Sequence, residues 1–389
     1  MYPAYRVREE KAVRQVETLI RDLFKASLEG KIVDGFVTFT EKKVGGGMQA
    51  ISIEVATDPS NLDQKLFSQY LAGGLPRLLS IPKIIQNQLA GCFDKKVAVV
   101  ARPCDVRALI ELSKRNQVAL GNLFVIGLEC PGTVPILDLL GAVKKRGVDP
   151  SKIESLTMTP AEVTVNDGTE KLSLKIGQDV KLRESCTRCN NREPIVSDIT
   201  LSAWGKDLSN SGMVLLEPKT EKGKSCLKVA QARGLVTNTS QLTKEEIEQR
   251  ESLVSEIEKQ ATEKLIKENM EFTRLIGEQR FKAFKDMFEP CTKCGLCVRA
   301  CPVCWCKDCI LLKKIKTIDQ LLLHTTRLIH MADTCVNCGK CDENCPKGIQ
   351  LSKIYYGLAC ELGKSTGYKP GLAPDQPSWR SGKVILADQ

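Results

Sequence analysis

Histidine is almost absent from this 389-residue chain, which contains only His324 and His330. Aromatic residues are also scarce, at 5% of the sequence. The lack of histidine argues against zinc enzymes with imidazole ligands and against catalysis by a histidine base. The lack of aromatic rings leaves few stacking platforms for single-stranded nucleic acid, and we expect no nucleic-acid partner.

Long apolar runs are missing as well. The best candidate, residues 123–143, is interrupted by Glu129, Pro131 and Asp138, so we predict no membrane span. Residues 1–10 are polar and charged where a secretory signal has its apolar core. These observations predict a cytoplasmic protein.

Cysteine, by contrast, is abundant, with 18 residues. Disulfides are rare in the cytosol, so this number points to bound metal. The net charge of +10 is spread over many lysine-rich segments. It predicts a solvated basic surface, or a basic face that meets an acidic partner protein or an anionic cofactor.

The N-terminal part has the pattern of an α/β domain. Apolar residues at helical spacing predict a helix over 13–26, and further helices are predicted at 62–79 and 106–116. Alternating or wholly apolar runs predict strands at 32–40, 49–56, 96–101 and 123–128. This order predicts a mostly parallel sheet covered by helices. Asn166-Asp167-Gly168, between two alternating runs, predicts a β-hairpin.

The strongest motif is a cysteine run that occurs twice. It reads Cys291-x2-Cys294-x2-Cys297-x3-Cys301-Pro302, then Cys335-x2-Cys338-x2-Cys341-x3-Cys345-Pro346. This is the spacing of bacterial ferredoxins with two [4Fe–4S] clusters, in which the fourth cysteine of each run ligates the other cluster. We therefore assign Cys291, Cys294, Cys297 and Cys345 to one cluster, and Cys335, Cys338, Cys341 and Cys301 to the second. A pair of zinc knuckles is the alternative that this spacing disfavours.

Two further groups of cysteines lie outside these runs. Cys304, Cys306 and Cys309 follow the first run, either as an additional metal site or as reduced thiols. Cys104 and Cys130 each follow a predicted strand, at the end of a parallel sheet where ligands gather. Together with Cys186-x2-Cys189 they make four thiols, enough for one more cluster, although distant cysteines also occur as plain core residues.

The residues around these cysteines resemble a known family. The stretches are Val100-Ala101-Arg102-Pro103-Cys104-Asp105-Val106-Arg107, Gly127-Leu128-Glu129-Cys130, Cys186-x2-Cys189 with Ser197-Asp198-Ile199, and the early segment 28–35. They are similar to the coenzyme F420 hydrogenase/dehydrogenase beta-subunit family over roughly residues 18–240. The resemblance implies that Cys104, Cys130, Cys186 and Cys189 hold a [4Fe–4S] cluster beside a flavin, usually FAD, which exchanges hydride with F420. Family members carry electrons into or out of formate dehydrogenases, hydrogenases and related complexes.

Cofactor contacts are predicted at Arg102, Asp105 and Arg107, next to Cys104. The alternative is that these three residues form a salt-bridged helix start. The chain departs from the family where a Gly-Gly-x-x-Thr-like stretch is expected, because residues 10–19 contain no glycine. Close approach of the backbone to a flavin phosphate requires such glycines, so we expect the phosphate-binding part of any flavin site to be altered in this chain. Gly45–Gly47, between two predicted strands, is interpreted as a hairpin turn.

We predict four units along the chain. They are an α/β domain over 1–240, a helical linker over 241–288, an α+β ferredoxin-like module over 289–365 and an extended tail over 366–389 that lies along a partner. The linker begins at a T-x-x-E capping box, Thr243 to Glu246, and a coiled-coil contact is its alternative role.

The predicted function is electron transfer in an anaerobic oxidoreductase complex. Three [4Fe–4S] clusters and FAD would link a hydride carrier such as F420, or a partner dehydrogenase, to other redox subunits, with no catalytic side chain of its own. The alternative is a flavin-free adaptor between a heterodisulfide reductase-like module and a formate dehydrogenase or hydrogenase.

The crossed ligand assignment is testable by substitution. We expect Cys291→Ser and Cys345→Ser to abolish the same cluster signal, although the two positions lie in different runs. Iron content and EPR spectra of the anaerobically purified variants measure this. If Cys345→Ser instead removes the signal that Cys335→Ser removes, the crossed assignment is wrong.

Overall fold

The structure is a computed structural model of the chain and describes residues 4–8, 15–44, 48–61, 80–202, 213–237 and 239–379. The predicted helix at 62–79 and the predicted turn at Gly45–Gly47 lie outside the described residues. So do residues 10–14 of the segment that was compared with the flavin-binding stretch.

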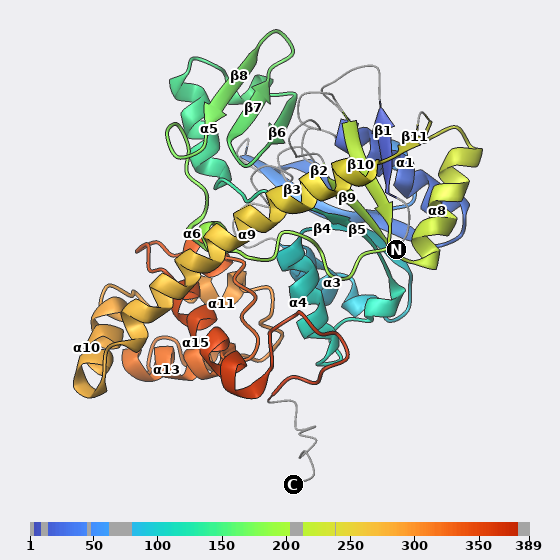
Figure 1. Cartoon of the computed structure of the whole chain (residues 1–389). Helices are drawn as coiled ribbons and strands as arrows, with labels where there is room; N and C mark the ends of the chain where they lie inside the picture. Colours follow the sequence, from blue (N-terminus) through green and yellow to red (C-terminus); the bar gives the residue numbers. More distant parts are fainter. Residues whose placement is uncertain are drawn as a thin grey trace.

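An eight-stranded mixed sheet forms the centre of the N-terminal part, with the order β11-β1-β10-β9-β5-β4-β2-β3 (Figure 1). Its strands are β1 (Tyr5–Arg8), β2 (Gly35–Val44), β3 (Met48–Ala56), β4 (Val97–Ala101), β5 (Leu123–Leu128), β9 (Ile199–Ser202), β10 (Met213–Pro218) and β11 (Thr239–Gln241). The central strands β2, β4, β5 and β9 are parallel, as predicted. The flanking pairs are antiparallel, so the sheet is mixed rather than mostly parallel.

Four longer helices accompany this sheet. They are α1 (Gln15–Glu29), α3 (Ile81–Asn87), α4 (Pro103–Ser113) and α8 (Glu221–Ala232), and α1 packs on α8. Single 3-10 turns occur at Pro59–Asn61, Ala90–Cys92, Leu120–Asn122 and Pro150–Lys152. Helix α4 starts earlier than its apolar pattern predicts, because Pro103 occupies the first turn and Asp105 caps the backbone N–H of Arg102 at 3.4 Å. This early start places Cys104 in the first turn, directly after β4.

A small unit with its own core projects from the domain. It contains α5 (Ile136–Lys145) and a three-stranded antiparallel sheet of β6 (Ser155–Met158), β7 (Glu162–Asn166) and β8 (Lys171–Lys175). The predicted hairpin is confirmed, since β7 and β8 pair and Gly168 adopts a φ of +89° in the connection.

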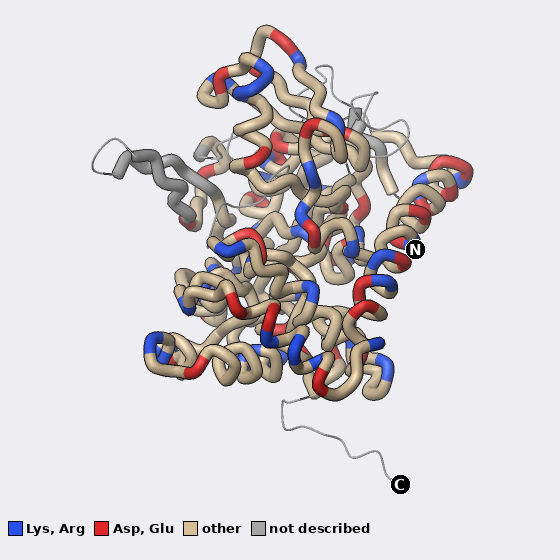
Figure 2. The backbone as a smooth tube through the Cα atoms, turned by 90° about the vertical axis from the view of Figure 1, so that its left-hand side faces the viewer, with Lys and Arg blue, Asp and Glu red and all other residues tan. Residues whose placement is uncertain are grey.

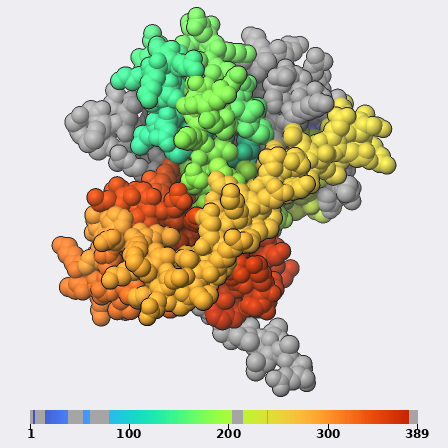
Figure 3. Space-filling view, turned by 60° about the vertical axis from the view of Figure 1, so that its left-hand side comes forward, coloured from blue at the N-terminus to red at the C-terminus, as the bar shows by residue number. Residues whose placement is uncertain are grey.

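The predicted linker is two helices. Helix α9 (Lys244–Thr273) starts at the expected capping box, where Thr243 Oγ1 accepts a hydrogen bond from Glu246 N at 3.3 Å. It ends before Gly277, whose φ is +49°, and α10 (Gly277–Phe288) follows. Val254, Ala261 and Leu265 of α9 are buried. Helix α9 therefore packs across the molecule from the sheet to the C-terminal module (Figures 1 and 3).

The C-terminal module is helical around its cysteine loops. Its helices are α11 (Leu296–Ala300), α12 (Ile310–Lys313), α13 (Gln320–Met331), α14 (Lys340–Glu343) and α15 (Leu351–Thr366). Phe288, Met331, Tyr355 and Ala359 belong to a core cluster that also contains several cysteines of both runs. The thiols are therefore part of the packing of this module.

The described part of the tail, up to residue 379, folds back on α4, and its contact with a partner stays a prediction. The Tyr368 hydroxyl and the Gly371 N–H both donate to Glu111 Oε1, at 2.6 Å and 2.7 Å. The Glu111 carboxylate also pairs with Lys114 and Arg115 and is fully buried. This polar network joins the tail to the α/β domain.

Charged residues of both signs are interspersed along the backbone (Figure 2). No helix among the described residues is long and apolar enough to cross a membrane.

Removing the charge of Glu111 should release the tail. We expect Glu111→Gln to lower the free energy of unfolding by about 3 kcal/mol, because Lys114 and Arg115 lose a buried counter-charge. Cleavage of residues 367–379 by a protease should also accelerate. Glu361→Gln, which removes an exposed pair with Lys364, is the matched control and should cost at most about 1 kcal/mol. Equal effects of the two variants would show that the buried network does not hold the tail.

Candidate metal centres

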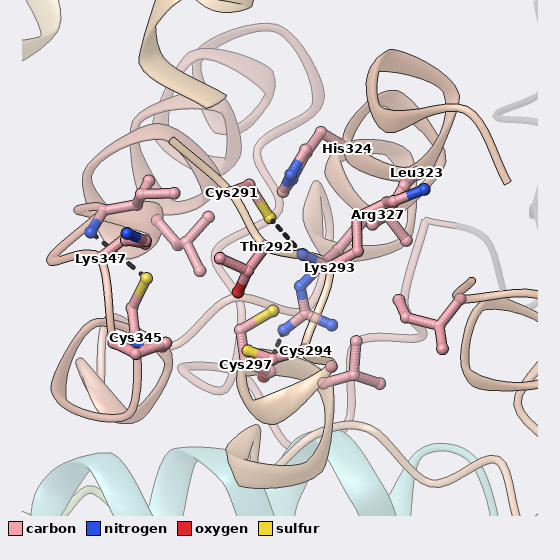
Figure 4. Close-up of a pocket in the computed structure, with 16 residues that line it drawn as sticks. Cys291, Thr292, Lys293, Cys294, Cys297, Leu323, His324, Arg327, Cys345 and Lys347 are labelled. Atoms are coloured by element: carbon pink, nitrogen blue, oxygen red, sulfur yellow. Dashed lines mark hydrogen bonds between the residues drawn. The ribbon is translucent and has the colours of Figure 1, made fainter. Parts of the chain in front are cut away.

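The first group of thiols surrounds one pocket. Cys291, Cys294, Cys297 and Cys345 all line it, and their sulfur atoms lie around a common space (Figure 4). The first three residues come from the loop before α11 and from α11 itself, and Cys345 follows α14. The structure thus brings together the set that the crossed assignment groups.

Both cysteine runs use the same backbone geometry. Lys293 and Asn337, which precede the second cysteine of each run, have φ values of 53° and 56°. Gly295 and Gly339, which follow it, have φ values of 73° and 69°. Left-handed residues in such a loop turn successive N–H groups inward, a geometry that favours anions. Lys293 N lies 3.3 Å from Cys291 Sγ, as expected for a loop that donates to thiolates.

The first pocket contains buried donors without an acceptor. Neither ring nitrogen of His324 has a hydrogen-bond partner, and neither does Nε of Arg327. Buried polar groups are nearly always paired, so the Arg327 Nε–H and the single N–H of a neutral His324 ring indicate a missing acceptor. The sulfides of an iron–sulfur cluster are acceptors of this kind, and the pocket therefore fits such a group. Burial lowers the pKa of His324 to about 4, so its ring, stacked on Phe288, is neutral at pH 7.

The second group consists of Cys335, Cys338, Cys341 and Cys301, and all four are largely buried. Burial raises the pKa of Cys335 to about 11 and that of Cys338 to about 12. Such thiols stay protonated at neutral pH unless a metal displaces the proton. Cys301 interacts electrostatically with Cys338, so the fourth cysteine of the first run lies near the second run. Its own pKa is lowered by a hydrogen bond from the Cys304 thiol.

The third group is assembled from three separate parts of the chain. Cys104 lies at the start of α4, Cys130 follows β5, and Cys186 lies in the short helix α6 (Glu184–Thr187), with Cys189 just after it. Cys130 interacts electrostatically with Cys104 and with Cys186, which in turn interacts with Cys189. Burial raises the pKa of Cys104, Cys130 and Cys189. The sequence analysis grouped these four thiols, and the fold places them together.

Arg192 holds the third group, and the sequence analysis missed it. This side chain is 3% exposed, and its Nη2 donates to Cys186 O at 2.9 Å while its Nη1 donates to Cys130 O at 3.4 Å. Its backbone N–H donates to Glu258 of α9 at 2.8 Å. Helix α9 therefore supports the loop that carries the Cys186-x2-Cys189 pair. In the sequence, the position of Arg192 shortly after the Cys186-x2-Cys189 pair was the only available sign of this role.

The third group lies directly against the second cysteine run. Asn337 Nδ2 donates to Ser185 O at 3.0 Å, and Arg188 Nε donates to Asn337 Oδ1 at 3.3 Å. A Cβ on Gly339 would collide with Ser185 Oγ, so only glycine permits this approach. Cys104 also interacts electrostatically with Cys338. The three groups thus form a continuous series across the two domains.

The three predicted cofactor contacts have different surroundings. Arg102 and Asp105 form the capping box of α4, and Arg102 interacts electrostatically with Cys104 and Cys130. Arg107 is 2% exposed, donates to Pro370 O at 2.8 Å and 3.1 Å, and lies over the Tyr356 ring. Its charge acts on Cys189 and Cys335, which belong to different groups. A direct cofactor contact of these residues stays a prediction.

Arg327 lies between the two ferredoxin-type groups, and the sequence analysis also missed it. It is 2% exposed, donates to Cys297 O at 2.7 Å and interacts electrostatically with Cys301 and Cys341. Among the described residues it forms no ion pair. An isolated buried guanidinium is costly, so anionic ligands on both sides would balance its charge. In the sequence, the only sign of this role is that Arg327 lies in the long insert between the two cysteine runs.

The remaining thiols, Cys304, Cys306 and Cys309, line another cavity together. Within the described ranges, no group of three Cys, His, Asp or Glu side chains is arranged to hold a single metal ion.

The fold and the thiol groups define an iron–sulfur electron-transfer protein that forms part of an oxidoreductase. Residues 287–349 match the family described as 4Fe-4S dicluster domain. Residues 94–244 match the family described as the C terminus of the beta subunit in coenzyme F420 hydrogenase/dehydrogenase.

Curated relatives agree with this class. The chain is 28% identical over 375 residues to the F420-dependent formate dehydrogenase subunit beta of Methanocaldococcus jannaschii, covering 91% of this chain and 92% of the relative. It is 30% identical over 306 residues to the F420-dependent formate dehydrogenase 1 subunit beta of Methanococcus maripaludis, covering 73% and 75%. The chain belongs to the coenzyme F420 hydrogenase/dehydrogenase beta-subunit family. A chain of the F420-reducing [NiFe] hydrogenase complex from Methanosarcina barkeri is also similar, with a TM-score of 0.49, 15% identity, and coverage of 74% of this chain and 92% of that chain.

The charge of Arg327 should set the potentials of its neighbours. We expect Arg327→Gln to lower the reduction potential of the adjacent clusters by tens of millivolts, because reduction adds negative charge that the guanidinium stabilises. Arg327→Lys keeps the charge and should retain most of the wild-type potential. EPR-monitored redox titration measures both variants, and Lys282→Gln on the exposed surface of α10 is the control. Equal potentials in the wild type and Arg327→Gln would contradict this role.

Proposed function

We propose that this chain conducts electrons through three [4Fe–4S] clusters, between a hydride-carrier site in the α/β domain and a partner redox subunit. The observation that carries the proposal is the continuous series of thiol groups. Cys130 and Cys104 belong to the third group, and Cys104 interacts electrostatically with Cys338 of the second group. Cys301 of the first cysteine run also interacts with Cys338, and the same run lines the pocket of the first group. Closely spaced clusters in a protein interior are suited to electron transfer, and burial and hydrogen bonds to sulfur set their potentials.

The substrate class follows from the relatives. Both curated relatives are named as beta subunits of F420-dependent formate dehydrogenases. By similarity, we propose that F420 is the hydride carrier and that a formate dehydrogenase or hydrogenase subunit is the partner, in the cytoplasm.

A flavin is part of this proposal. When bound, FAD supplies the conversion between hydride and single-electron chemistry, which iron–sulfur clusters do not provide. The strand ends at Cys104 and Cys130 are where a ligand binds in an open α/β sheet. Arg102 adds a buried positive charge there that is suited to an anionic cofactor.

A flavin assay tests the proposal. Because residues 10–19 contain no glycine, we expect FAD to be retained in the anaerobically purified complex and to be lost from the isolated chain. The intact complex should reduce F420 with electrons from the partner's substrate, and the isolated chain should show little F420-dependent dye reduction. HPLC of released flavin and F420 absorbance provide the measurements.

The alternative is a flavin-free adaptor that links a heterodisulfide reductase-like module to a formate dehydrogenase or hydrogenase. The glycine-free segment favours it. Iron without flavin in the intact complex would support the adaptor. Stoichiometric FAD on the isolated chain, with rapid F420 turnover, would refute the hypothesis that the flavin-binding site is altered.

A further inference from the structure

Three cysteines remain outside the proposed relay, and they share one cavity. Cys304, Cys306 and Cys309 all line a cavity of about 770 Å³ between the C-terminal module and the helices α3 and α4. The loop that carries them is fixed to α3, because Lys83 Nζ donates to Cys304 O at 2.6 Å and Gln86 Nε2 donates to Trp305 O at 2.9 Å.

The cavity is strongly basic. Its lining contains no Asp or Glu and includes five cations, which are Lys83, Lys114, Arg115, Arg299 and Arg327. Lys114 and Arg115 are paired with Glu111. None of the ion pairs among the described residues involves the other three. Such a surface attracts an anion and disfavours a bare divalent cation.

The arrangement of the three thiols argues against a site for a single metal ion. The three side chains do not converge as ligands of one metal ion, and neither do the cysteines of the ferredoxin-type runs. In a cubane each thiolate binds a different iron atom, so its ligands do not need to converge on a single ion. A cubane with three thiolates is anionic, which matches the charge of the cavity.

Arg327 connects this cavity to one of the three thiols. It lines the cavity and is 2% exposed. Its Nη1 lies 3.8 Å from Cys304 Sγ. This long contact would become a charge-assisted hydrogen bond if Cys304 were a thiolate in a cluster.

We propose that Cys304, Cys306 and Cys309 bind a further [4Fe–4S] cluster, whose fourth iron carries a non-protein ligand and faces the basic cavity. The Cys304 backbone N–H donates to Cys301 O at 3.2 Å, so this cluster would lie next to the second ferredoxin-type group. Cys306 is exposed, and the cluster therefore lies at the surface, where a partner protein has access to it.

Metal analysis of variants tests this site without relying on the other three clusters. The double variant Cys306→Ser/Cys309→Ser, purified anaerobically in its complex, should lose about four iron atoms per chain, since a cubane contains four. Cys360→Ser removes a half-buried thiol outside all four groups and should keep the full iron content. The EPR signals of the other clusters should persist in both variants. Unchanged iron in the double variant, or the loss of one zinc instead, would overturn the proposal.

Two further measurements keep the test decisive if the double variant folds poorly. In the wild-type complex, iodoacetamide should not alkylate Cys306, although it is exposed, until the iron is removed with a chelator. Ready alkylation before iron removal would show a free thiol and contradict the site. Arg299→Glu should also reduce the retention of these irons, because it places a carboxylate beside an anionic cluster, whereas a zinc site would be retained or strengthened.

Discussion

Buried guanidinium groups that need anionic counterparts are the constraint on which this structure depends. Arg107, Arg192 and Arg327 are each less than a tenth exposed and lie among the cysteine groups. Arg107 and Arg327 form no ion pair with a carboxylate in the described part of the chain. Burying an uncompensated charge costs several kcal/mol, so the fold is arranged for negatively charged ligands at these positions. The same positive charges favour the reduced, more negative state of a cluster. The arginines that depend on bound anionic ligands for the stability of the fold therefore also raise the reduction potentials of those ligands.

Packing between the domains keeps the cysteine groups in order. Helix α9 supplies Glu258 and Glu268 to the loop of the third group, through Arg192 and Arg188. The tail adds a second connection through Glu111. These two connections therefore fix the position of the α/β domain relative to the ferredoxin-like module. Electron transfer requires such fixed spacing, whereas a mobile linker would vary it.

The contrast between the two ferredoxin-type groups has a structural origin. In a pair of identical loops, both clusters would have similar surroundings. Here the insert between the runs places His324 beside the first pocket, while in the second run Asn337 donates to Ser185 O. Different hydrogen-bond donors and charges give different potentials, so the insert provides a means to make the series directional.

The sequence by itself determined those features that depend on local spacing. Each cysteine run fits its loop because three thiols and two left-handed residues lie within a few positions of one another, and the capping box at Thr243 and the hairpin at Gly168 are equally local. The association of Cys104 with Cys130 was also foreseeable, since the ends of adjacent parallel strands meet at one edge of a sheet. Tertiary structure alone decided which charges surround the thiols, where α9 breaks and where the tail packs. Arg192, Arg327 and Glu111 acquire their roles from partners far away in the chain, and no periodicity or motif encodes such contacts, because they depend on how the domains pack.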